Sequence, residues 1–240
     1  MAEAAPQMFQ RYPVVTHEVC VGRQTIRLLA PMGAEKLLER PAVAKRFERD
    51  EYMPYWAELW PASLLLAAEV GRWSPAAGHP QPPRVLELGC GLGLVGIVAA
   101  SLGYPVILSD YDDDALAFAA ENARRNGLPG LPTRRVDWRE SHADLRAERI
   151  LAADVLYETR HHRPVAEFIR THLAGTGFAW VCDPDRVTAD GFETVARHCG
   201  LSVETRTARR PKDGSQGAVS GRVFHIRHKP ALGVPSRAAL

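Results

Sequence analysis

Cysteine is scarce in this sequence of 240 residues, and the four cysteines present are scattered. Cys20, Cys90, Cys182 and Cys199 form no C-x-x-C pair, which disfavours a disulfide framework or a zinc site and fits a reduced cytoplasmic setting. Residues 1–13 contain no apolar segment of signal-peptide length. No uninterrupted apolar run approaches the roughly 18 residues that a membrane span needs. We therefore expect a cytoplasmic protein without a bound metal or a membrane anchor.

An excess of charge of one sign is also lacking. Lysine and arginine total 30 and aspartate and glutamate 28, which leaves a formal net charge of +2. This balance provides no general attraction to nucleic acid or to an anionic membrane, so we expect neither as a partner. Apolar residues make up 46% and charged residues 24% of the chain. These values are close to the averages for globular domains and exclude a disordered, fibrous or collagen-like chain.

The first third of the chain predicts a β-hairpin followed by helices. Residues 14–21 and 25–30 are rich in β-branched side chains and flank a Gly-Arg-Gln turn. Residues 33–47 have helical spacing. An aromatic segment, 52–61, follows, and Pro61 suits the first turn of a second helix that runs to about residue 72.

A proline-rich stretch separates this extension from a different pattern. Residues 74–83 carry four prolines and predict a linker, so we expect an N-terminal hairpin and helical extension over residues 1–73. Alternating strands and helices then predict an α/β domain over residues 84–228, followed by a mobile tail, 229–240. We predict a Rossmann-like, doubly wound sheet of seven strands, mostly parallel, with the last strand antiparallel.

The expected strands of this domain are short, and the first of them is apolar. They cover residues 84–88, 105–109, 133–136, 149–155, 177–182, 201–207 and 223–228, and the helices between them cover 94–102, 112–126, 164–173 and 188–199. In such sheets, ligands bind beyond the carboxyl ends of the strands. The candidate site residues are therefore those that follow each strand.

Two polar clusters are expected to be solvated. His161 and His162 are adjacent and lack the carboxylate spacing of a metal site, so we expect both at an exposed helix start. Arg209, Arg210 and Lys212 are expected in an exposed loop, where contact with a protein substrate is the alternative.

A glycine-rich turn follows the first strand of the α/β domain. Gly91, Gly93 and Gly96 fit the G-x-G-x-x-G pattern, and Asp110 lies near the distance at which that pattern expects a ribose-binding acid. Both a nicotinamide dinucleotide and S-adenosylmethionine are compatible with these glycines.

Glu87 favours S-adenosylmethionine. Its carboxylate comes two residues before Gly89 and would repel a pyrophosphate seated on the following helix N-terminus. It would suit a cofactor that has no phosphate and carries an ammonium and a sulfonium. Asp110 would accept hydrogen bonds from the ribose hydroxyls. A nicotinamide-dependent oxidoreductase remains the alternative that the glycines support.

The segment 87–93 resembles the first motif of the class I, seven-β-strand methyltransferases that use S-adenosylmethionine. Within that class the chain is similar to the protein-lysine methyltransferases over about residues 56–228. The sequence that begins at Trp60 is similar to their upstream tryptophan motif, which lines the cofactor site. The pair Asp137-Trp138 is similar to their adenine-side motif.

Two motifs after later strands extend the resemblance. Residues 154–158 are similar to the D-x-x-Y signature of that group, which lies at the methyl-acceptor site. Residues 183–186 are similar to the D-P-G-R of the branch that methylates the electron-transfer flavoprotein β-subunit, except that Asp185 replaces the glycine.

The resemblance implies a set of site residues. The implied cofactor contacts are Trp60, Glu87, Gly89, Gly91, Gly93, Asp110, Tyr111, Asp137, Trp138 and Asp154. The implied catalytic residues are Asp154 and Tyr157, and the implied substrate contacts are Tyr157, Glu158, Asp183 and Arg186. Asp154 would orient the acceptor amine, although its negative charge alone favours the protonated amine.

The resemblance implies N-methylation of a lysine side chain in a protein substrate. N-methylation of a small molecule is the alternative, because the aromatic segment 52–61 could cover a compact pocket.

Overall fold

The computed structural model describes residues 7–37, 53–213 and 216–229, together with residues 43, 45, 47 and 48. The strands of its main sheet are β4 (Val85–Leu88), β5 (Val106–Asp110), β6 (Thr133–Arg135), β7 (Ala147–Ala153), β8 (Leu173–Asp183), β9 (Leu201–Arg210) and β10 (Val219–His228). They lie side by side in the order β6-β5-β4-β7-β8-β10-β9. The predicted Rossmann-like sheet of seven strands is confirmed.

The strand directions also follow the prediction. β4 pairs in parallel with β5 and β7, β5 pairs in parallel with β6, and β7 pairs in parallel with β8. The last strand, β10, inserts between β8 and β9 and is antiparallel to both. The carboxyl ends of the parallel strands therefore meet at one edge of the sheet.

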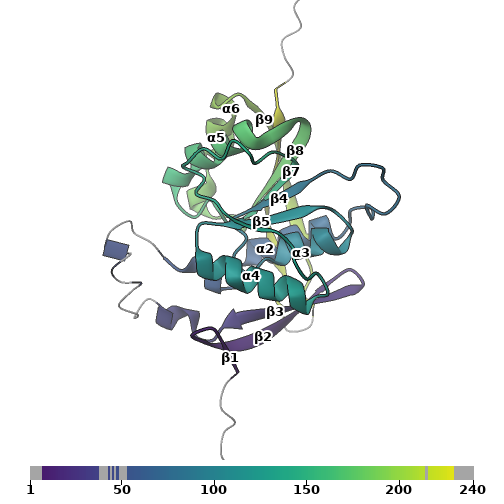
Figure 1. Ribbon diagram of the computed structural model, residues 1–240. Coiled ribbons are helices and arrows are strands. Elements are labelled where there is room, and N and C mark those ends of the chain that lie inside the picture. Colours follow the sequence, from purple (N-terminus) through teal and green to yellow (C-terminus); the bar gives the residue numbers. More distant parts are fainter. Residues whose placement is uncertain are drawn as a thin grey trace, which may run out of the picture.

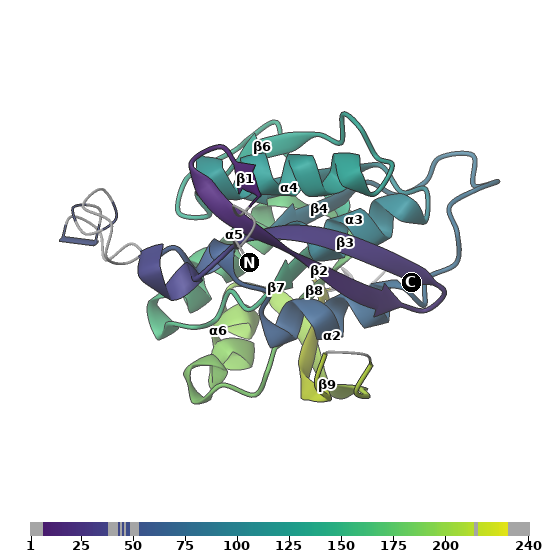
Figure 2. The same cartoon turned by 90° about the horizontal axis from the view of Figure 1, so that it is seen from below.

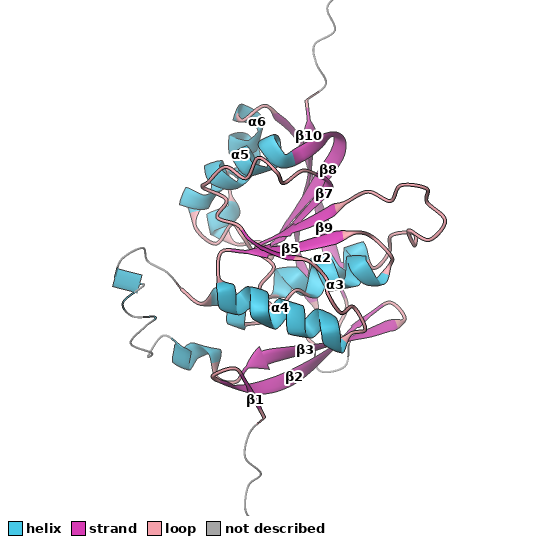
Figure 3. Cartoon of the chain, in the orientation of Figure 1, coloured by secondary structure: helices cyan, strands magenta, loops and turns pink. Residues whose placement is uncertain are grey.

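Helices cover both faces of the sheet (Figures 1 and 3). One face carries α2 (Pro61–Val70), α3 (Leu94–Ser101) and α4 (Asp113–Arg125), and the other carries α5 (His162–His172) and α6 (Phe192–His198). Pro61 occupies the first turn of α2 as expected. The Asp112 side chain accepts a hydrogen bond from the Asp114 N–H and caps α4. The described residues include no helix long and apolar enough to cross a bilayer.

A second, smaller sheet lies beyond the helical layer of α2, α3 and α4 (Figure 2). It consists of β1 (Met8–Phe9), β2 (Tyr12–Val21) and β3 (Gln24–Pro31), all antiparallel, which confirms the predicted hairpin. Asn122 of α4 accepts from Leu29 N at 2.7 Å and donates to Leu29 O at 3.1 Å and to Leu92 O at 3.0 Å. One side chain thus links the hairpin to the glycine-rich turn, in which Leu92 lies between Gly91 and Gly93.

Several element boundaries differ from the sequence analysis; β9, for example, extends to Arg210, and β10 already begins at Val219. β7 ends at Ala153 rather than at residue 155, because Asp154 adopts a φ of 58° that a strand cannot continue. The helix expected from Thr188 begins only at Phe192, because Gly191 has a φ of 87° and separates α6 from the short 3-10 turn η4 (Val187–Ala189). β8 begins at Leu173, directly after α5, rather than at residue 177.

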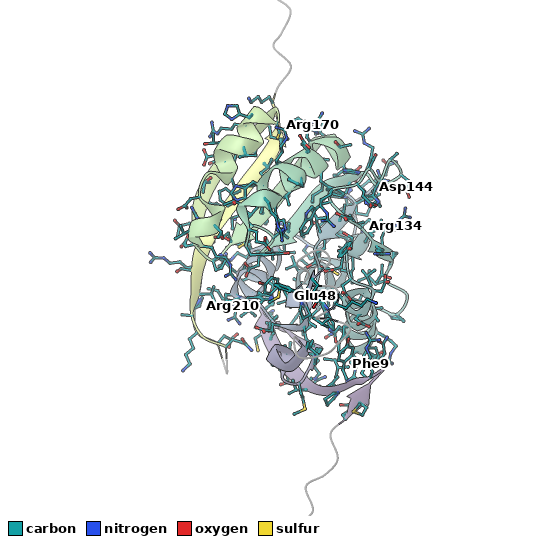
Figure 4. All side chains as sticks on the ribbon, turned by 90° about the vertical axis from the view of Figure 1, so that its left-hand side faces the viewer. Phe9, Glu48, Arg134, Asp144, Arg170 and Arg210 are labelled. Carbon is teal, nitrogen blue, oxygen red and sulfur yellow. The ribbon has the colours of Figure 1, made fainter. Side chains whose placement is uncertain are left out.

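The connection between β6 and β7 contains no helix. Arg134 of β6 and Asp144 of this loop form an ion pair, with 2.9 Å between Nη2 and Oδ2 (Figure 4). This ion pair links the loop to the edge strand β6, whose three residues are all exposed.

The prediction for residues 209–212 was partly wrong. Arg209 and Arg210 belong to β9, and Arg210 is only 4% exposed. Its Nη2 donates to the Cys20 carbonyl at 3.3 Å, so this guanidinium ties β9 to the hairpin (Figure 4). Seven of the fifteen residues of the helix expected over residues 33–47 lie outside the described residues. The described part contains a 3-10 turn, η1 (Ala34–Leu37), and residues 43, 45 and 47. The division of the chain at residues 74–83 stays a prediction.

Candidate functional site

A cavity of about 380 Å³ lies at the carboxyl ends of the parallel strands. Its walls come from segments that follow strands and from the segment that leads into α2: residues 53–63, 87–94, 110–112, 137–139, 153–164 and 186. This is the place where the sequence analysis expected a ligand.

Most of the residues singled out in the sequence line this cavity. They are Trp60, Glu87, Gly89, Gly91, Asp110, Tyr111, Asp137, Trp138, Asp154, Tyr157, Glu158 and Arg186. Gly93 and Asp183 are not among the lining residues.

Gly93 and Asp183 support the walls from behind. Gly93 precedes α3 with a φ of 82°, and a Cβ built on it would lie 3.1 Å from the Cβ of Ala119. This glycine therefore lets α3 approach α4. Asp183 is fully buried, and its Oδ1 accepts from the Arg186 N–H at 2.7 Å. It shapes the loop after β8.

Asp110 is held in place by backbone amides. Its Oδ2 accepts from the Gly91 N–H at 2.9 Å, and its Oδ1 accepts from the Asp112 N–H at 3.0 Å. Burial raises the pKa of this carboxyl to about 6. The remaining lone pairs of both oxygens are available to hydroxyl donors.

Glu87 is buried more deeply than its place in the sequence suggested. It is 3% exposed, and its Oε2 accepts from the Gly96 N–H at 2.8 Å. Burial raises the pKa of Glu87 to about 8. In the free protein this carboxyl is therefore mostly protonated at neutral pH, and its charge depends on what lies in the cavity.

The wall on the β6 side is built by Asp137 and Trp138. Asp137 forms an ion pair with Arg139, with 2.6 Å between Oδ2 and Nη2. Burial acts to raise the pKa of Asp137, but hydrogen bonds from Arg139 outweigh it and lower the pKa. Trp138 packs edge-on against His161, with ring centroids 5.4 Å apart. The sequence analysis did not include Arg139 among the site residues and expected His161 to be solvated.

An ion pair closes the opposite part of the cavity. Arg186 Nε lies 2.7 Å from Asp154 Oδ1, and Arg186 Nη2 lies 3.1 Å from Asp154 Oδ2. The guanidinium also lies over the ring of Trp60, 5.3 Å from its centroid. The Asp154 side chain is 5% exposed and that of Arg186 is 34% exposed. The sequence placed these residues after β7 and β8, which are neighbours, but did not predict that they pair.

Aromatic side chains surround this ion pair. The rings of Tyr55 and Tyr157 meet edge to face with centroids 5.0 Å apart, and those of Tyr55 and Trp60 lie 5.8 Å apart. Burial raises the pKa of Tyr157, so its hydroxyl stays protonated and can donate a hydrogen bond. Tyr55 belongs to the aromatic segment noted in the sequence, but that pattern does not distinguish it from its neighbours. Glu158 lies on the same wall, paired with Arg160 at 2.6 Å.

Arg222 of β10 organises the loop that carries Arg186. Its Nε lies 3.1 Å from Asp185 Oδ1, its Nη1 lies 2.8 Å from Asp190 Oδ1, and its Nη2 donates to the Arg186 carbonyl at 2.9 Å. Asp185 has a φ of 65°, a conformation that glycine adopts freely and aspartate tolerates. Asp185 thus adopts a conformation that is open to glycine, and it forms an ion pair with Arg222 that a glycine could not form.

The two histidines are not solvated as expected. His162 is 4% exposed, and its Nε2 lies 2.8 Å from the Thr188 carbonyl. His161 lines the cavity and packs against Tyr157 with ring centroids 4.7 Å apart. Burial lowers the pKa of both imidazoles. The prediction was wrong because α6 and the aromatic wall cover this helix start.

Comparison with known proteins identifies a family. The sequence model of the lysine methyltransferase family matches residues 47–190, which include every site residue named in the sequence analysis. The histone-arginine methyltransferase METTL23 of Xenopus laevis is 33% identical over 124 residues, covering 48% of this chain and 51% of the relative. The protein N-lysine methyltransferase METTL21A of Xenopus tropicalis is 37% identical over 106 residues, covering 42% and 47%. The chain thus spans about half the length of the curated relatives it matches.

Solved structures confirm the fold. A TehB-like S-adenosylmethionine-dependent methyltransferase from Corynebacterium glutamicum has a TM-score of 0.51 with 17% sequence identity, covering 79% of this chain and 100% of that chain. At this identity the likeness concerns the arrangement of strands and helices.

Proposed function

This chain belongs to the lysine methyltransferase family, and we propose that it transfers a methyl group from S-adenosylmethionine to the side-chain nitrogen of a lysine in a protein. The similarity to METTL21A supports a protein lysine as the acceptor. The observation that carries the proposal lies on the glycine side of the cavity. Of the groups in the described part of the chain, only backbone N–H groups donate to Glu87 and Asp110 there.

The charges of the cavity suit a cationic, phosphate-free cofactor. Seven acidic side chains and three arginines line it, and each arginine pairs with one of the acids. A pyrophosphate would lie beside the carboxylate of Asp110, to which only backbone N–H groups donate in the described part of the chain, and would oppose ionisation of Glu87. This disfavours the nicotinamide-dependent alternative.

Three residues on this side would hold the cofactor. Asp110 would accept hydrogen bonds from the ribose hydroxyls, and Trp138 would lie on the adenine side. Glu87 would face the cationic amino-acid portion. Because a nearby cation favours the ionised carboxyl, binding would lower the pKa of Glu87 from about 8 and release a proton.

The other half of the cavity would position the acceptor. When bound, S-adenosylmethionine supplies an electrophilic methyl group on its sulfonium. Orientation of the acceptor nitrogen then provides most of the catalysis, and well-oriented pairs gain on the order of 7–11 kcal/mol. Asp154 and Tyr157 would orient that nitrogen, because both line the cavity and carry groups that hydrogen-bond an amine.

The acceptor must also lose a proton, because a lysine amine has an ordinary pKa of about 10.4. The negative charge of Asp154 would oppose this loss, whereas a positive charge close by, such as the sulfonium of a bound cofactor, would favour it. The aromatic wall of Tyr55, Trp60 and Tyr157 further disfavours a charged ammonium through desolvation, although the ring faces partly compensate.

Isothermal titration calorimetry tests the cofactor assignment. We expect S-adenosylhomocysteine to bind the purified protein with a micromolar dissociation constant, and NAD⁺ not to bind at comparable concentrations. Tight binding of NAD⁺ without binding of S-adenosylhomocysteine would refute the proposal.

A labelled methyl donor tests the acceptor. The protein is incubated with methyl-labelled S-adenosylmethionine and a lysate from cells that lack the gene, and labelled peptides are identified by mass spectrometry. Label on lysine Nε supports the proposal, and label on arginine instead would indicate an acceptor like that named for METTL23. The Tyr157→Ala variant should reduce incorporation at unchanged S-adenosylhomocysteine affinity.

N-methylation of a small molecule is the second candidate. The aromatic wall favours it because rings on several sides can enclose a compact amine. Label that appears only in the metabolite fraction of the same lysate would select this candidate.

A further inference from the structure

The acceptor half of the cavity already holds a cation that belongs to the chain itself. The guanidinium of Arg186 binds both oxygens of Asp154 and stacks on Trp60. A bidentate carboxylate and an aromatic face are also the two groups that recognise a lysine or arginine side chain. We propose that Arg186 is an internal occupant of the acceptor site, and that the cationic side chain of the substrate replaces it on Asp154. This inference rests on the proposed function, because it assigns this half of the cavity to the acceptor.

The exposed fractions of the two side chains place Arg186 on the outer side of its ion pair with Asp154. Its side chain is 34% exposed and that of Asp154 is 5% exposed, and the guanidinium occupies both carboxylate oxygens. A cation that binds both oxygens of Asp154 therefore has to displace it. Because one cation replaces another, the buried carboxylate does not stand alone before or after the exchange, which avoids the large cost of an unpaired buried charge.

The backbone of Arg186 is anchored independently of its side chain. Its N–H donates to Asp183 Oδ1 at 2.7 Å, and its carbonyl accepts from Arg222 Nη2 at 2.9 Å. The guanidinium can therefore leave Asp154 by side-chain rotation while the loop stays in place. Asp183 and Arg222 act as positioning residues for this movement.

Exchange lowers the apparent affinity for the substrate cation. If the internal pair is formed in about nine molecules of ten, the apparent dissociation constant is about tenfold weaker than that of the vacated site. Removing the guanidinium should therefore strengthen binding. If Arg186 were a permanent part of the acceptor site, the same change would weaken binding.

Two small cations serve as probes in the test. n-Butylammonium represents a lysine side chain and n-butylguanidinium an arginine side chain, and each is titrated by NMR into the protein, free and loaded with S-adenosylhomocysteine. We expect Arg186→Met to bind at least one probe about tenfold more tightly than the unaltered protein does. The probe with the larger gain identifies the class of acceptor.

Matched variants isolate the effect. Arg163→Met removes an exposed guanidinium of α5 that pairs with Glu167 and does not line the cavity, and should leave both affinities within about twofold. Asp154→Asn keeps a residue that tolerates the positive φ and should abolish probe binding with or without Arg186→Met. Unchanged or weaker binding of both probes by Arg186→Met would overturn the proposal.

A measurement on the unaltered protein covers the case in which Arg186→Met fails to fold. At saturating probe, the Nε–H resonance of Arg186 should shift and exchange faster with solvent, and an unperturbed resonance would contradict exchange. Calorimetry with S-adenosylhomocysteine tests the proposed function separately. A chain that exchanges Arg186 but binds no S-adenosylhomocysteine would defeat methyl transfer and leave the exchange intact.

Discussion

The two halves of the cavity handle their carboxylates in opposite ways. On the glycine side, Glu87 and Asp110 receive backbone N–H groups, and burial raises the pKa of both. On the acceptor side, Asp154 and Glu158 pair with arginines of the chain. On the glycine side, a ligand would have to supply the positive charge that balances these carboxyls. On the acceptor side, arginines of the chain supply it.

This difference has a physical cost that can be measured. A buried carboxyl without a cation destabilises the free protein when it ionises, whereas a paired carboxylate does not. The glycine side should therefore show strong effects of pH and ligand on stability. The acceptor side should respond mainly to changes in its side-chain pairs.

The largest expected effect concerns Glu87→Gln and its dependence on pH. Because the pKa of Glu87 is about 8 in the folded protein and 4.5 ordinarily, unfolding releases a proton between these values, and rising pH favours the unfolded state. Each unit of difference corresponds to about 1.4 kcal/mol. Urea unfolding should show Glu87→Gln more stable than the unaltered protein at pH 8.5 and similar to it at pH 4.5.

Glu158→Gln is the matched control for that prediction. Its carboxylate is on the acceptor side and pairs with Arg160, so its removal should not reproduce the gain in stability at pH 8.5. If the free energy of unfolding depended on pH in the same way for Glu87→Gln and the unaltered protein, the proposed difference between the two halves of the cavity would be refuted.

The next effect is on cofactor affinity. Asp110→Asn should weaken S-adenosylhomocysteine binding by one to two orders of magnitude at pH 8, because a hydrogen bond to a charged group contributes roughly 1.5–3 kcal/mol. Calorimetry provides the measurement. Asp113→Asn changes an acid whose side chain is 81% exposed nearby and should have little effect. Equal losses in both variants would mean that general charge, rather than the position of Asp110, drives binding.

A smaller effect is expected from the packing behind the glycine side. Gly93→Ala should lower the free energy of unfolding by about 1–3 kcal/mol, because the new methyl group meets Ala119 and the residue keeps a strained φ. At Gly127 the φ is 79° and a Cβ would have no atom within 4 Å. Gly127→Ala therefore adds the backbone strain but no close contact of the new methyl group. Denaturant unfolding should show the larger loss for Gly93→Ala, and equal losses would exclude a role for the contact.

The smallest effect belongs to the loop on the acceptor side. Asp185→Gly relieves the backbone at a φ of 65° but removes the ion pair with Arg222, so the two changes should cancel to within about 1 kcal/mol. Asp185→Ala loses the ion pair and gains no relief. Thermal unfolding should place Asp185→Ala below Asp185→Gly, and the reverse order would contradict this account of the D-P-x-R loop.

The sequence predicted the glycine side better than the acceptor side. Strand β5 ends in Asp110 and strand β4 leads into Gly89 and Gly91, so local pattern and parallel topology together bring these residues to one place. The fold was predictable for the same reason, because buried apolar strands alternate with helices that have clear first and last residues.

The acceptor side depends on contacts that no local pattern encodes. The Arg186 side chain reaches Asp154 across 32 positions of sequence, whereas its backbone N–H donates to Asp183. Tyr55 arrives from the segment before α2. His162 is buried because Phe192 of α6 packs against it, with ring centroids 5.6 Å apart. These arrangements require the packed molecule.

Asn122 carries a lesson for protein engineering. Its side-chain amide forms hydrogen bonds with the backbone of Leu29 in β3 and with the carbonyl of Leu92. The small N-terminal sheet and the glycine-rich turn that lines the cavity are therefore held by the same side chain. A chimaera that exchanges the hairpin for another sequence would have to preserve the edge at Leu29 that meets this amide. If this edge were lost, Asn122 would be held less firmly, and with it the Leu92 segment of the cavity wall, although the hairpin itself does not line the cavity.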